Sequence, residues 1–146
     1  MRIKRIRLFK QRFMPLLLLG DEQEEMLRRY LSRADLYALY APDLKTVCAV
    51  TVDGKVCEIR SIATHLRAQN CGYGKKMIDY LCRLYGSRCT TMLAGTGDSP
   101  MTLPFYERCG FTEAYREREH FLKYYDHPVY ENGVQLIDKV FLTRQI

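Results

Sequence analysis

A short loop at residues 69–74 has the residue types that bind an anion. An apolar, strand-like segment (residues 56–63) precedes it, and a run at helical spacing that begins with two lysines (residues 75–85) follows it. The first turn of a helix presents unpaired N–H groups and the positive end of its dipole. Gly72 and Gly74 have no Cβ, so a phosphate can approach their backbone closely. The pattern therefore predicts a phosphate-binding strand–loop–helix unit.

The loop does not match the two best-known nucleotide-binding patterns. It lacks the G-x-x-x-x-G-K-[ST] spacing of a Walker loop, and a dinucleotide-binding G-x-G-x-x-G turn would need glycine at Met77. What remains is Gln69-x-x-Gly72-x-Gly74 after a strand. This pattern resembles the acetyl-CoA pyrophosphate loop of the GNAT superfamily of N-acetyltransferases, [Q/R]-x-x-G-x-[G/A].

Two further stretches support the same resemblance. Residues 62–64 (Ile-Ala-Thr) stand where those enzymes have an I-A-V-like strand end. Residues 105–111 (Phe-Tyr-Glu-Arg-Cys-Gly-Phe) look like the family's second signature, a short helix that carries a tyrosine and closes on Gly-Phe. The chain is thus similar to a small, single-domain bacterial GNAT enzyme, with recognisable motifs over about residues 56–111.

The resemblance implies how acetyl-CoA is bound. In the superfamily two adjacent parallel strands splay apart, the end of one pairs with the pantetheine arm, and the loop amides hold the pyrophosphate. One amide, at or near Ile62, would polarise the acetyl carbonyl as a one-donor oxyanion site. The residues implied in coenzyme binding are Ile62, Ala63, Thr64, Gln69, Asn70, Cys71, Gly72, Tyr73, Gly74, Lys75, Asp98 and Tyr106.

The resemblance also implies two catalytic groups. Tyr106 matches the family's tyrosine near the thioester sulfur, and a phenol with a reference pKa of about 10 stays protonated at neutral pH and can act as general acid. Glu58, four residues before Ile62 and so expected on the same strand face, is the candidate general base, with Asp98 and His120 in reserve. Each has a plainer interpretation, with Tyr106 as a packing residue and Glu58 as a charge on a solvated strand face.

Three positions depart from the family pattern. Asn70 stands where many relatives have glycine, which would stiffen the loop. Asp98 stands near an asparagine that contacts the pantetheine or the acceptor in many relatives, so that contact is in doubt. Residues 92–94 (Met-Leu-Ala) lack the glutamate that some relatives carry on the fifth main strand.

The segment from Glu119 to Glu131 is expected to line the acceptor side. It holds tyrosines and the carboxylates of Asp126 and Glu131, which would suit a cationic primary amine through charge and cation–π contact. A peptide amine would fit the same expectation. The same composition would also suit a loop packed against its own domain.

Hydrophobic patterns and turn signals predict one α/β domain over residues 1–146. The expected fold is α+β, with a GNAT-like, mixed, mostly antiparallel central sheet of about six to seven strands, about four flanking helices and a parallel splayed pair at the cofactor site. The expected strands span residues 3–8, 36–40, 46–52, 55–63, 89–93, 111–118 and 134–143, and the expected helices span residues 15–19, 21–33, 75–85 and 101–109.

Side-chain spacing predicts details of two helices. An Asp21-x-x-Glu24 capping box begins the second helix, and arginines up to Arg33 favour its C-terminal end. In the helix 75–85, an Asp79–Arg83 ion pair is expected. The expected buried faces are Met26, Leu27, Tyr30 and Leu31, and Met77, Leu81, Leu84 and Tyr85.

Composition limits the functional classes less sharply. A formal charge of +6 suits anionic partners in general, coenzyme A and nucleic acid alike. Six cysteines without C-x-x-C or Cys/His metal spacing indicate no metal site and free, buried thiols in a reducing cytoplasm. No apolar stretch is long enough to span a membrane.

Two alternatives to the enzyme stay open. A GNAT-like domain that binds acetyl-CoA could regulate or pair with another protein without catalysis. A basic nucleic-acid-binding domain is the second, although no DNA- or RNA-reading motif is present and nucleic acid is an unlikely partner. Exposed strand edges would allow a homodimer.

Overall fold

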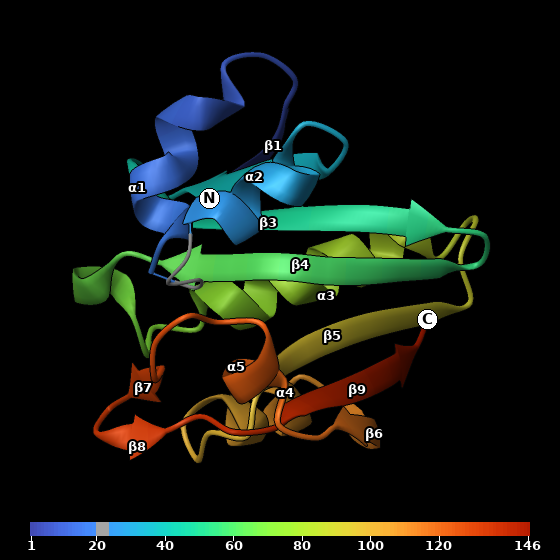
Figure 1. The fold of residues 1–146 in the computed structure, drawn as a ribbon. Helices are drawn as coiled ribbons and strands as arrows, with labels where there is room; N and C mark the ends of the chain where they lie inside the picture. The colour runs from blue at the N-terminus through green and yellow to red at the C-terminus, as the bar shows by residue number, and fades with distance from the viewer. Residues whose placement is uncertain (20–23) are drawn as a thin grey trace.

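The computed structural model describes residues 1–19 and 24–146, and its centre is a seven-stranded sheet. Its strands are β1 (Arg2–Ile6), β2 (Asp35–Tyr40), β3 (Leu44–Asp53), β4 (Val56–Thr64), β5 (Thr91–Gly97), β6 (Thr112–Glu117) and β9 (Lys139–Gln145). The order is β1-β2-β3-β4-β5-β9-β6, and only β4 and β5 are parallel neighbours (Figure 1). The predicted mixed, mostly antiparallel sheet with one parallel pair is confirmed.

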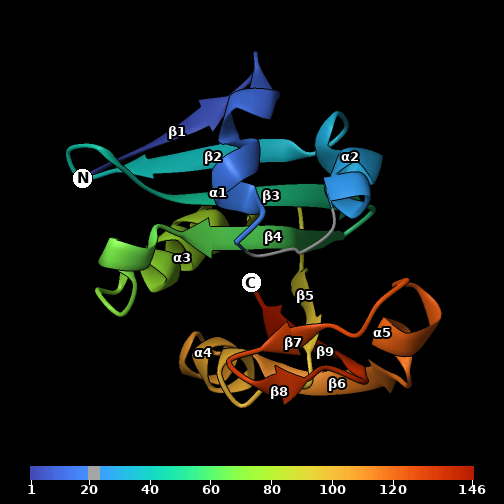
Figure 2. The same cartoon turned by 60° about the vertical axis from the view of Figure 1, so that its left-hand side comes forward.

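Helices cover both faces of the sheet (Figure 1, Figure 2). On one face lie α1 (Met14–Leu17) and α2 (Glu24–Leu31), and on the other lie α3 (Tyr73–Tyr85) and α4 (Thr102–Arg108). Short 3₁₀ turns at Lys10–Phe13 and Leu66–Ala68 and the short helix α5 (His120–Lys123) complete the helical elements of the described residues. No helix in this part of the chain is both long and apolar enough to cross a bilayer.

Each face of the sheet has its own hydrophobic core. The α3-side core gathers around Met77, Leu81 and Met92, and the α2-side core around Leu17 and Leu27. The central strand β3 contributes to both by alternation, because residues on either side of the pleat are covered. A strand buried on both faces has a continuous apolar run, as residues 47–50 do.

The predicted strands 36–40, 46–52 and 55–63 form an antiparallel meander of β2, β3 and β4. Asp53 still pairs with Val56, so Gly54 and Lys55 connect β3 to β4, and Gly54 takes a φ of 61°, which a glycine adopts at little cost. The helix predicted from Asp21 begins at Glu24 among the described residues, and Asp21 lies outside them.

Strand β5 is longer than predicted. The sequence indicated a loop from Ala94 onward because glycines weaken a strand pattern, but β5 pairs with β9 through Gly97. Gly95 and Gly97 leave room for side chains that pack directly over their Cα atoms. A Cβ on Gly95 would lie 2.5 Å from Lys139, and one on Gly97 would lie 2.7 Å from Leu136.

The C-terminal region also differs from the prediction. The connection 119–131 contains α5 and the strand β7 (Tyr130–Glu131), and the expected last strand is divided into β8 (Val134–Gln135) and β9. The turn between β7 and β8 is Asn132-Gly133, a pair typical of tight hairpin turns, with φ of 50° and 78°. These two short strands form a ribbon apart from the main sheet.

Two expectations about α3 were wrong. Leu84 is 42% exposed and lies off the buried face. Asp79 does not pair with Arg83; it pairs with Lys75 at 2.9 Å and with Arg144 of β9 at 3.1 Å. The link to Arg144 crosses from helix to sheet, which a pattern within the helix cannot reveal.

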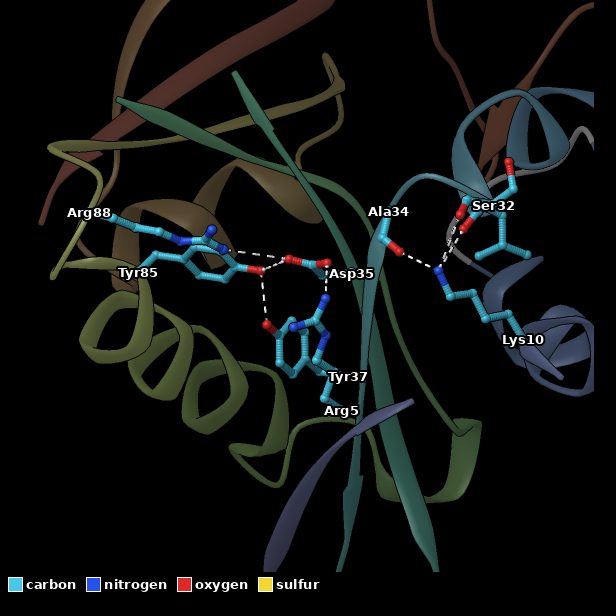
Figure 3. A network of polar contacts seen from close by, with 9 residues as sticks. Arg5, Lys10, Ser32, Ala34, Asp35, Tyr37, Tyr85 and Arg88 are labelled. Carbon is cyan, nitrogen blue, oxygen red and sulfur yellow. Dashed lines mark hydrogen bonds and ion pairs between the residues drawn. The ribbon is translucent and has the colours of Figure 1, made fainter. Parts of the chain in front are cut away.

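A polar network joins the C-terminal end of α3 to the first two strands (Figure 3). The Tyr85 hydroxyl donates to Asp35 Oδ2 at 2.7 Å and therefore accepts from the Tyr37 hydroxyl at 2.9 Å. Arg5 lies 2.6 Å from Asp35 Oδ1, and Arg88 lies 3.7 Å from Oδ2. Burial raises the pKa of both tyrosines, so their hydroxyls keep their protons and serve as donors.

Candidate active site

Strands β4 and β5 pair over only part of their length. Their parallel register runs from Val56 opposite Thr91 to Ile59 opposite Ala94 and then stops. Beyond this point β4 remains paired with β3, and β5 remains paired with β9. The two strands diverge at their C-terminal ends (Figure 1, Figure 2). Backbone groups on the facing edges of residues 60–64 and 95–97 therefore lack a ladder partner across the gap.

A bulge in β4 lies at the start of this gap. In the register with β3, Val50 faces Ile59 and Ala49 faces Ser61, so Arg60 is an extra residue in β4. The bulge exchanges the two faces of the strand. Before it, Ile59 belongs to the α3-side core; after it, Ile62 packs against that core.

The bulge corrects one prediction about Glu58. Two-residue alternation placed Glu58 on the same face as Ile62, but the extra residue puts them on opposite faces, and Glu58 lies on the α2 side. Its Oε1 accepts from Arg60 Nη1 at 3.0 Å. Arg60 in turn lies 5.1 Å from the centre of the Tyr30 ring on α2.

The loop after β4 has the conformation of an anion site. Gln69 Nε2 donates to the Thr64 carbonyl at 3.1 Å and so closes the loop onto the strand end. Asn70 and Gly72 both adopt positive φ, 62° and 85°. Asparagine tolerates this region better than most residues, so Asn70 can replace a glycine here. Gly72 is the N-cap of α3, whose first amides are unpaired.

The two glycines of the loop have different roles. A Cβ on Gly72 would meet nothing within 4 Å, so this position needs glycine for its left-handed φ and leaves open space above the helix end. A Cβ on Gly74 would lie 3.0 Å from the ring of Phe105 on α4. Glycine at position 74 therefore allows α4 to pack close to α3, in addition to any access that it gives to a phosphate.

We expect Gly72→Ala to raise the Kd for acetyl-CoA by about tenfold. A non-glycine residue with left-handed φ costs roughly 1–2 kcal/mol, and coenzyme binding must bear that cost where the loop amides are held in place. Isothermal titration calorimetry measures the change. The matched control is Gly54→Ala, which has a positive φ of 61° and open space but lies in the β3–β4 turn. An equal loss of affinity in both variants would contradict a specific role for the loop.

One large cleft contains most of the predicted site residues. Its volume is about 1150 Å³, and it lies where β4 and β5 part. Of the predicted residues, it is lined by Glu58, Ile62, Ala63, Thr64, Gln69, Asn70, Gly72, Tyr73, Gly74, Lys75, Tyr106 and His120. Cys71 and Asp98 are not in its lining, and Cys71 is the one exposed thiol among six free cysteines.

Tyr106 lies at the wall of this cleft on α4. It is 6% exposed, and its ring packs edge-on against Phe105 and Phe111, at centroid distances of 5.2 Å and 5.5 Å. Burial is the main cause that raises the pKa of its hydroxyl, so the phenol stays protonated. It can therefore donate a hydrogen bond into the cleft.

Asp98 has a structural role that the sequence did not indicate. Its Oδ1 accepts from the Ile137 N–H at 3.0 Å, and its own N–H donates to the Asp138 carbonyl at 3.1 Å. Asp138 Oδ1 accepts from the Glu119 N–H at 3.0 Å. Asp98 thus fixes the end of the segment that leads into β9, and Asp138 links that end to Glu119 at the segment's start.

That segment lines the cleft only in part. Tyr125, Tyr130 and Glu131 are in the lining, whereas Asp126 is not; its side chain is 88% exposed and lies 2.6 Å from His127 Nδ1. Burial raises the pKa of the Glu131 carboxyl, although a hydrogen bond from Ser99 acts in the opposite direction. Tyrosines of this segment therefore line the cleft, as expected, whereas the expected Asp126 carboxylate does not.

Helix α2 and the turn after it add basic residues that the sequence analysis did not place in the site. Met26, Arg29, Tyr30 and Arg33 line the cleft, at the spacing of one helical face. The same arginines were interpreted as favourable charges at a helix end. The helical spacing of Arg29 and Arg33 was visible, but their position over β4 depends on tertiary contacts.

The geometry agrees with comparisons to known proteins. The model of the acetyltransferase (GNAT) family matches residues 23–111, which include β4, the loop, α3 and α4. The chain belongs to the GNAT family. This GNAT acetyltransferase transfers an acyl group from acetyl-CoA. Its parted strands β4 and β5 and the loop after β4 agree with the family match in sequence.

Its relatives support this assignment. It is 32% identical over 131 residues to the uncharacterized N-acetyltransferase YvbK of Bacillus subtilis, covering 87% of this chain and 84% of that protein. A B. subtilis acetyltransferase in complex with CoA is 29% identical with a TM-score of 0.88, over 99% and 98% of the two chains. A GNAT family acetyltransferase from Elizabethkingia anophelis with acetyl-CoA bound is 25% identical with a TM-score of 0.89, over 99% and 97%.

The residues of this GNAT acetyltransferase fit acetyl-CoA. The unpaired edge of β4 can bind an amide-bearing arm as a strand would, and the amides at the start of α3 face the space left open at Gly72. Lys75 adds positive charge in the lining, although it also pairs with Asp79 at 2.9 Å. Lys76, the second predicted basic residue, lies over the Tyr73 ring instead of in the lining.

Proposed function

We propose that this protein is an N-acetyltransferase that moves the acetyl group of acetyl-CoA directly to a primary amine in a ternary complex. The observation that supports it is the parting of β4 and β5 beside Tyr106 and Glu58, all within one cleft. Acetyl-CoA supplies the activated acetyl group as a thioester. The cleft is large enough to admit an amine alongside it, as direct transfer requires.

The backbone of β4 would bind and polarise the reacting group. Amides between Arg60 and Thr64 face the gap, and one at or near Ile62 would donate to the acetyl carbonyl oxygen. The loop from Gln69 to Lys75 would hold the pyrophosphate. Fixed backbone donors stabilise developing negative charge without reorganisation, which is why this placement favours acyl transfer.

Tyr106 and Glu58 would handle the protons. In the balanced reaction the amine loses one proton as its nitrogen bonds to the acetyl carbon, and the sulfur gains one as its bond to that carbon breaks. Tyr106 would donate to the sulfur, and Glu58 would accept the amine's proton, through water where the distance requires it. Glu131 is the alternative base, because it lines the same cleft.

We expect Glu58→Gln to lower kcat by about 10²–10⁴-fold and to remove the acidic limb of the pH–rate profile. A general base stops working when it is protonated, so the wild-type rate falls at low pH. A variant without that base should not show this fall. The acceptor in this assay is a hydrazide, whose weakly basic nitrogen keeps its own titration out of the profile.

The matched variant is Glu131→Gln. Because burial raises the pKa of Glu131, a limb that belongs to Glu131 would appear at higher pH than for an ordinary glutamate. Loss of the limb in Glu131→Gln, with the limb kept in Glu58→Gln, would assign the base to Glu131 and contradict our proposal.

The function is tested by a thermal-shift titration with acetyl-CoA followed by thiol-release assays over peptides, polyamines and aminoglycosides. We expect protection by coenzyme, amine-dependent thiol release and intersecting initial-velocity lines, since both substrates are bound before chemistry. Parallel lines would indicate a covalent acetyl-enzyme and contradict direct transfer. Protection without thiol release from any amine would indicate a binding domain.

A further inference from the structure

We propose that the acceptor amine carries an anionic group, a carboxylate or a phosphate, that Arg29 and Arg33 bind. This inference rests on the proposed N-acetyltransferase function and names the class of its acceptor. Both arginines line the cleft, one on α2 and one just beyond its end.

Neither arginine is neutralised by a strong ion pair. Arg29 lies 3.9 Å from Glu25, and both side chains are mostly exposed, a geometry that contributes little. Arg33 forms no ion pair with any residue in the described ranges 1–19 and 24–146. By contrast Arg60, the third arginine in this wall, lies 3.0 Å from Glu58 and is neutralised by it. The charge of the α2 wall is therefore available to a ligand.

Arg33 is also not required to stabilise the end of α2. Lys10 fills that role, because its Nζ donates to the carbonyls of Leu31 and Ala34 and lies 3.5 Å from that of Ser32 (Figure 3). A cation at the last carbonyls of a helix satisfies them directly. Stabilisation of the C-terminal end of α2 therefore does not explain why Arg33 lines the cleft.

The position of α2 separates these arginines from the coenzyme loop. The Tyr30 hydroxyl lies 3.4 Å from the Arg60 carbonyl, so α2 sits over the middle of β4. The loop that begins after Thr64 lies beyond the end of the strand, and both views show it away from α2 (Figure 1, Figure 2). The arginines at α2 thus form a positive region apart from the loop that would hold the phosphates of coenzyme A.

Acidic groups line the same cleft as these arginines. Glu58 and Glu131 are the carboxylates in the lining, and with Tyr106 they surround the place where an amine would react. An acceptor whose amine is near these groups can extend its other end toward α2. A bound anion there would gain charge-assisted hydrogen bonds from two guanidinium groups, which present planar sets of donors.

The test compares acceptors that differ only by the anion. The pairs are 4-aminobutanoate with butylamine, and O-phosphoethanolamine with ethanolamine. We expect kcat/KM to be at least about tenfold higher for the anionic member of one pair. The double variant Arg29→Gln/Arg33→Gln should lower that ratio by roughly ten- to a hundredfold, through KM. The pair with the larger ratio identifies the anion.

The control variant is Arg28→Gln. Arg28 lies on the same helix, pairs with Glu24 at 3.3 Å and borders a different hollow, beside Lys10. It should leave the ratio unchanged. A wild-type ratio near one for both pairs, or a double variant that keeps the wild-type ratio, would overturn the inference. A weaker Kd for acetyl-CoA in the double variant would also overturn it, since the arginines would then serve the coenzyme.

A binding measurement separates this inference from the proposed function. If no amine releases thiol, the proposed function fails, and thermal shifts in the presence of CoA then decide the inference alone. Greater protection by 4-aminobutanoate or O-phosphoethanolamine than by its neutral partner, lost in the double variant, would support it. Equal shifts within both pairs would refute it.

Discussion

Replacing Tyr106 with phenylalanine is expected to lower kcat by about 10²–10⁴-fold, with little change in the Kd for acetyl-CoA. The substitution removes only the hydroxyl. The ring contacts with Phe105 and Phe111 remain, so the local packing should survive. The lost function is hydrogen-bond and proton donation to the departing sulfur, which matters in the transition state and not in binding.

Burial makes this role chemically consistent. It raises the pKa of Tyr106, and a thiolate leaving into the same cleft is also desolvated, which raises the proton affinity of the sulfur. Tyr106 should therefore remain protonated, and wild-type kcat should show no alkaline loss from its ionisation below about pH 10. Stopped assays at saturating acetyl-CoA measure kcat, and calorimetry measures Kd.

The control for this prediction is Tyr115→Phe. Tyr115 is 54% exposed on β6, stacks on Phe141 and lies outside the cleft lining, so its variant should behave as wild type. Wild-type turnover in Tyr106→Phe would remove the assignment of Tyr106 as the acid. An equal loss of coenzyme affinity would instead indicate a role in binding.

The second prediction is a steep loss of stability at alkaline pH. Burial raises the pKa of four thiols above the ordinary value, those of Cys48, Cys57, Cys82 and Cys109, and for Cys57 and Cys109 the raised values are about 12 and about 11. When the folded pKa is the higher one, the stabilisation is complete below the unfolded pKa and is lost as pH rises above it.

The size of the effect follows from linkage. Each such thiol costs about 1.4 kcal/mol of unfolding free energy per pH unit above an unfolded pKa of about 8.5, so Cys48, Cys57 and Cys109 together cost roughly 4 kcal/mol per unit, and Cys82 adds to this. Typical domains are stable by about 5–15 kcal/mol, so we expect unfolding within roughly one to three pH units above pH 9. Tyr37, Tyr85 and Tyr106 add to the loss above about pH 10, because their pKa values are raised as well.

Urea titrations from pH 7 to 11, with reductant present, measure this dependence. Cys57→Ala should reduce the alkaline slope by about 1.4 kcal/mol per pH unit, whatever it does to stability at pH 7. Cys71→Ala, at the exposed thiol, should leave the slope as it is. A free energy that stays constant from pH 8 to 11 would show that these thiols ionise equally in both states.

Local signals carried most of the fold prediction. The strand–loop–helix unit depends on contiguous residues, so Gln69, Gly72 and Gly74 indicated both its structure and its place in the cleft. The β3–β4 hairpin likewise follows a local signal, Gly54, although its two turn residues are Gly54 and Lys55. In these cases the backbone conformation is determined by residues only a few positions apart.

The wrong or missing predictions involve contacts between distant segments. One extra residue at Arg60 moved Glu58 to the other face of β4, and only the pairing with β3 reveals it. Asp98 resembled a ligand-binding position, yet it binds the Ile137 amide 39 residues away. The arginines of α2 could be placed on one helical face, but not over the strand that this face covers.

The short ladder between β4 and β5 has a consequence for the lifetime of the protein. Four residue pairs, from Val56–Thr91 to Ile59–Ala94, join these neighbours, and under our proposal acetyl-CoA would occupy the gap beyond them as a surrogate strand. A ligand that binds only the folded form adds about 2.7 kcal/mol of stability at a hundred times its Kd. Resistance to proteolysis should therefore rise and fall with the acetyl-CoA supply, and a starved cell would degrade this protein faster than a well-fed one.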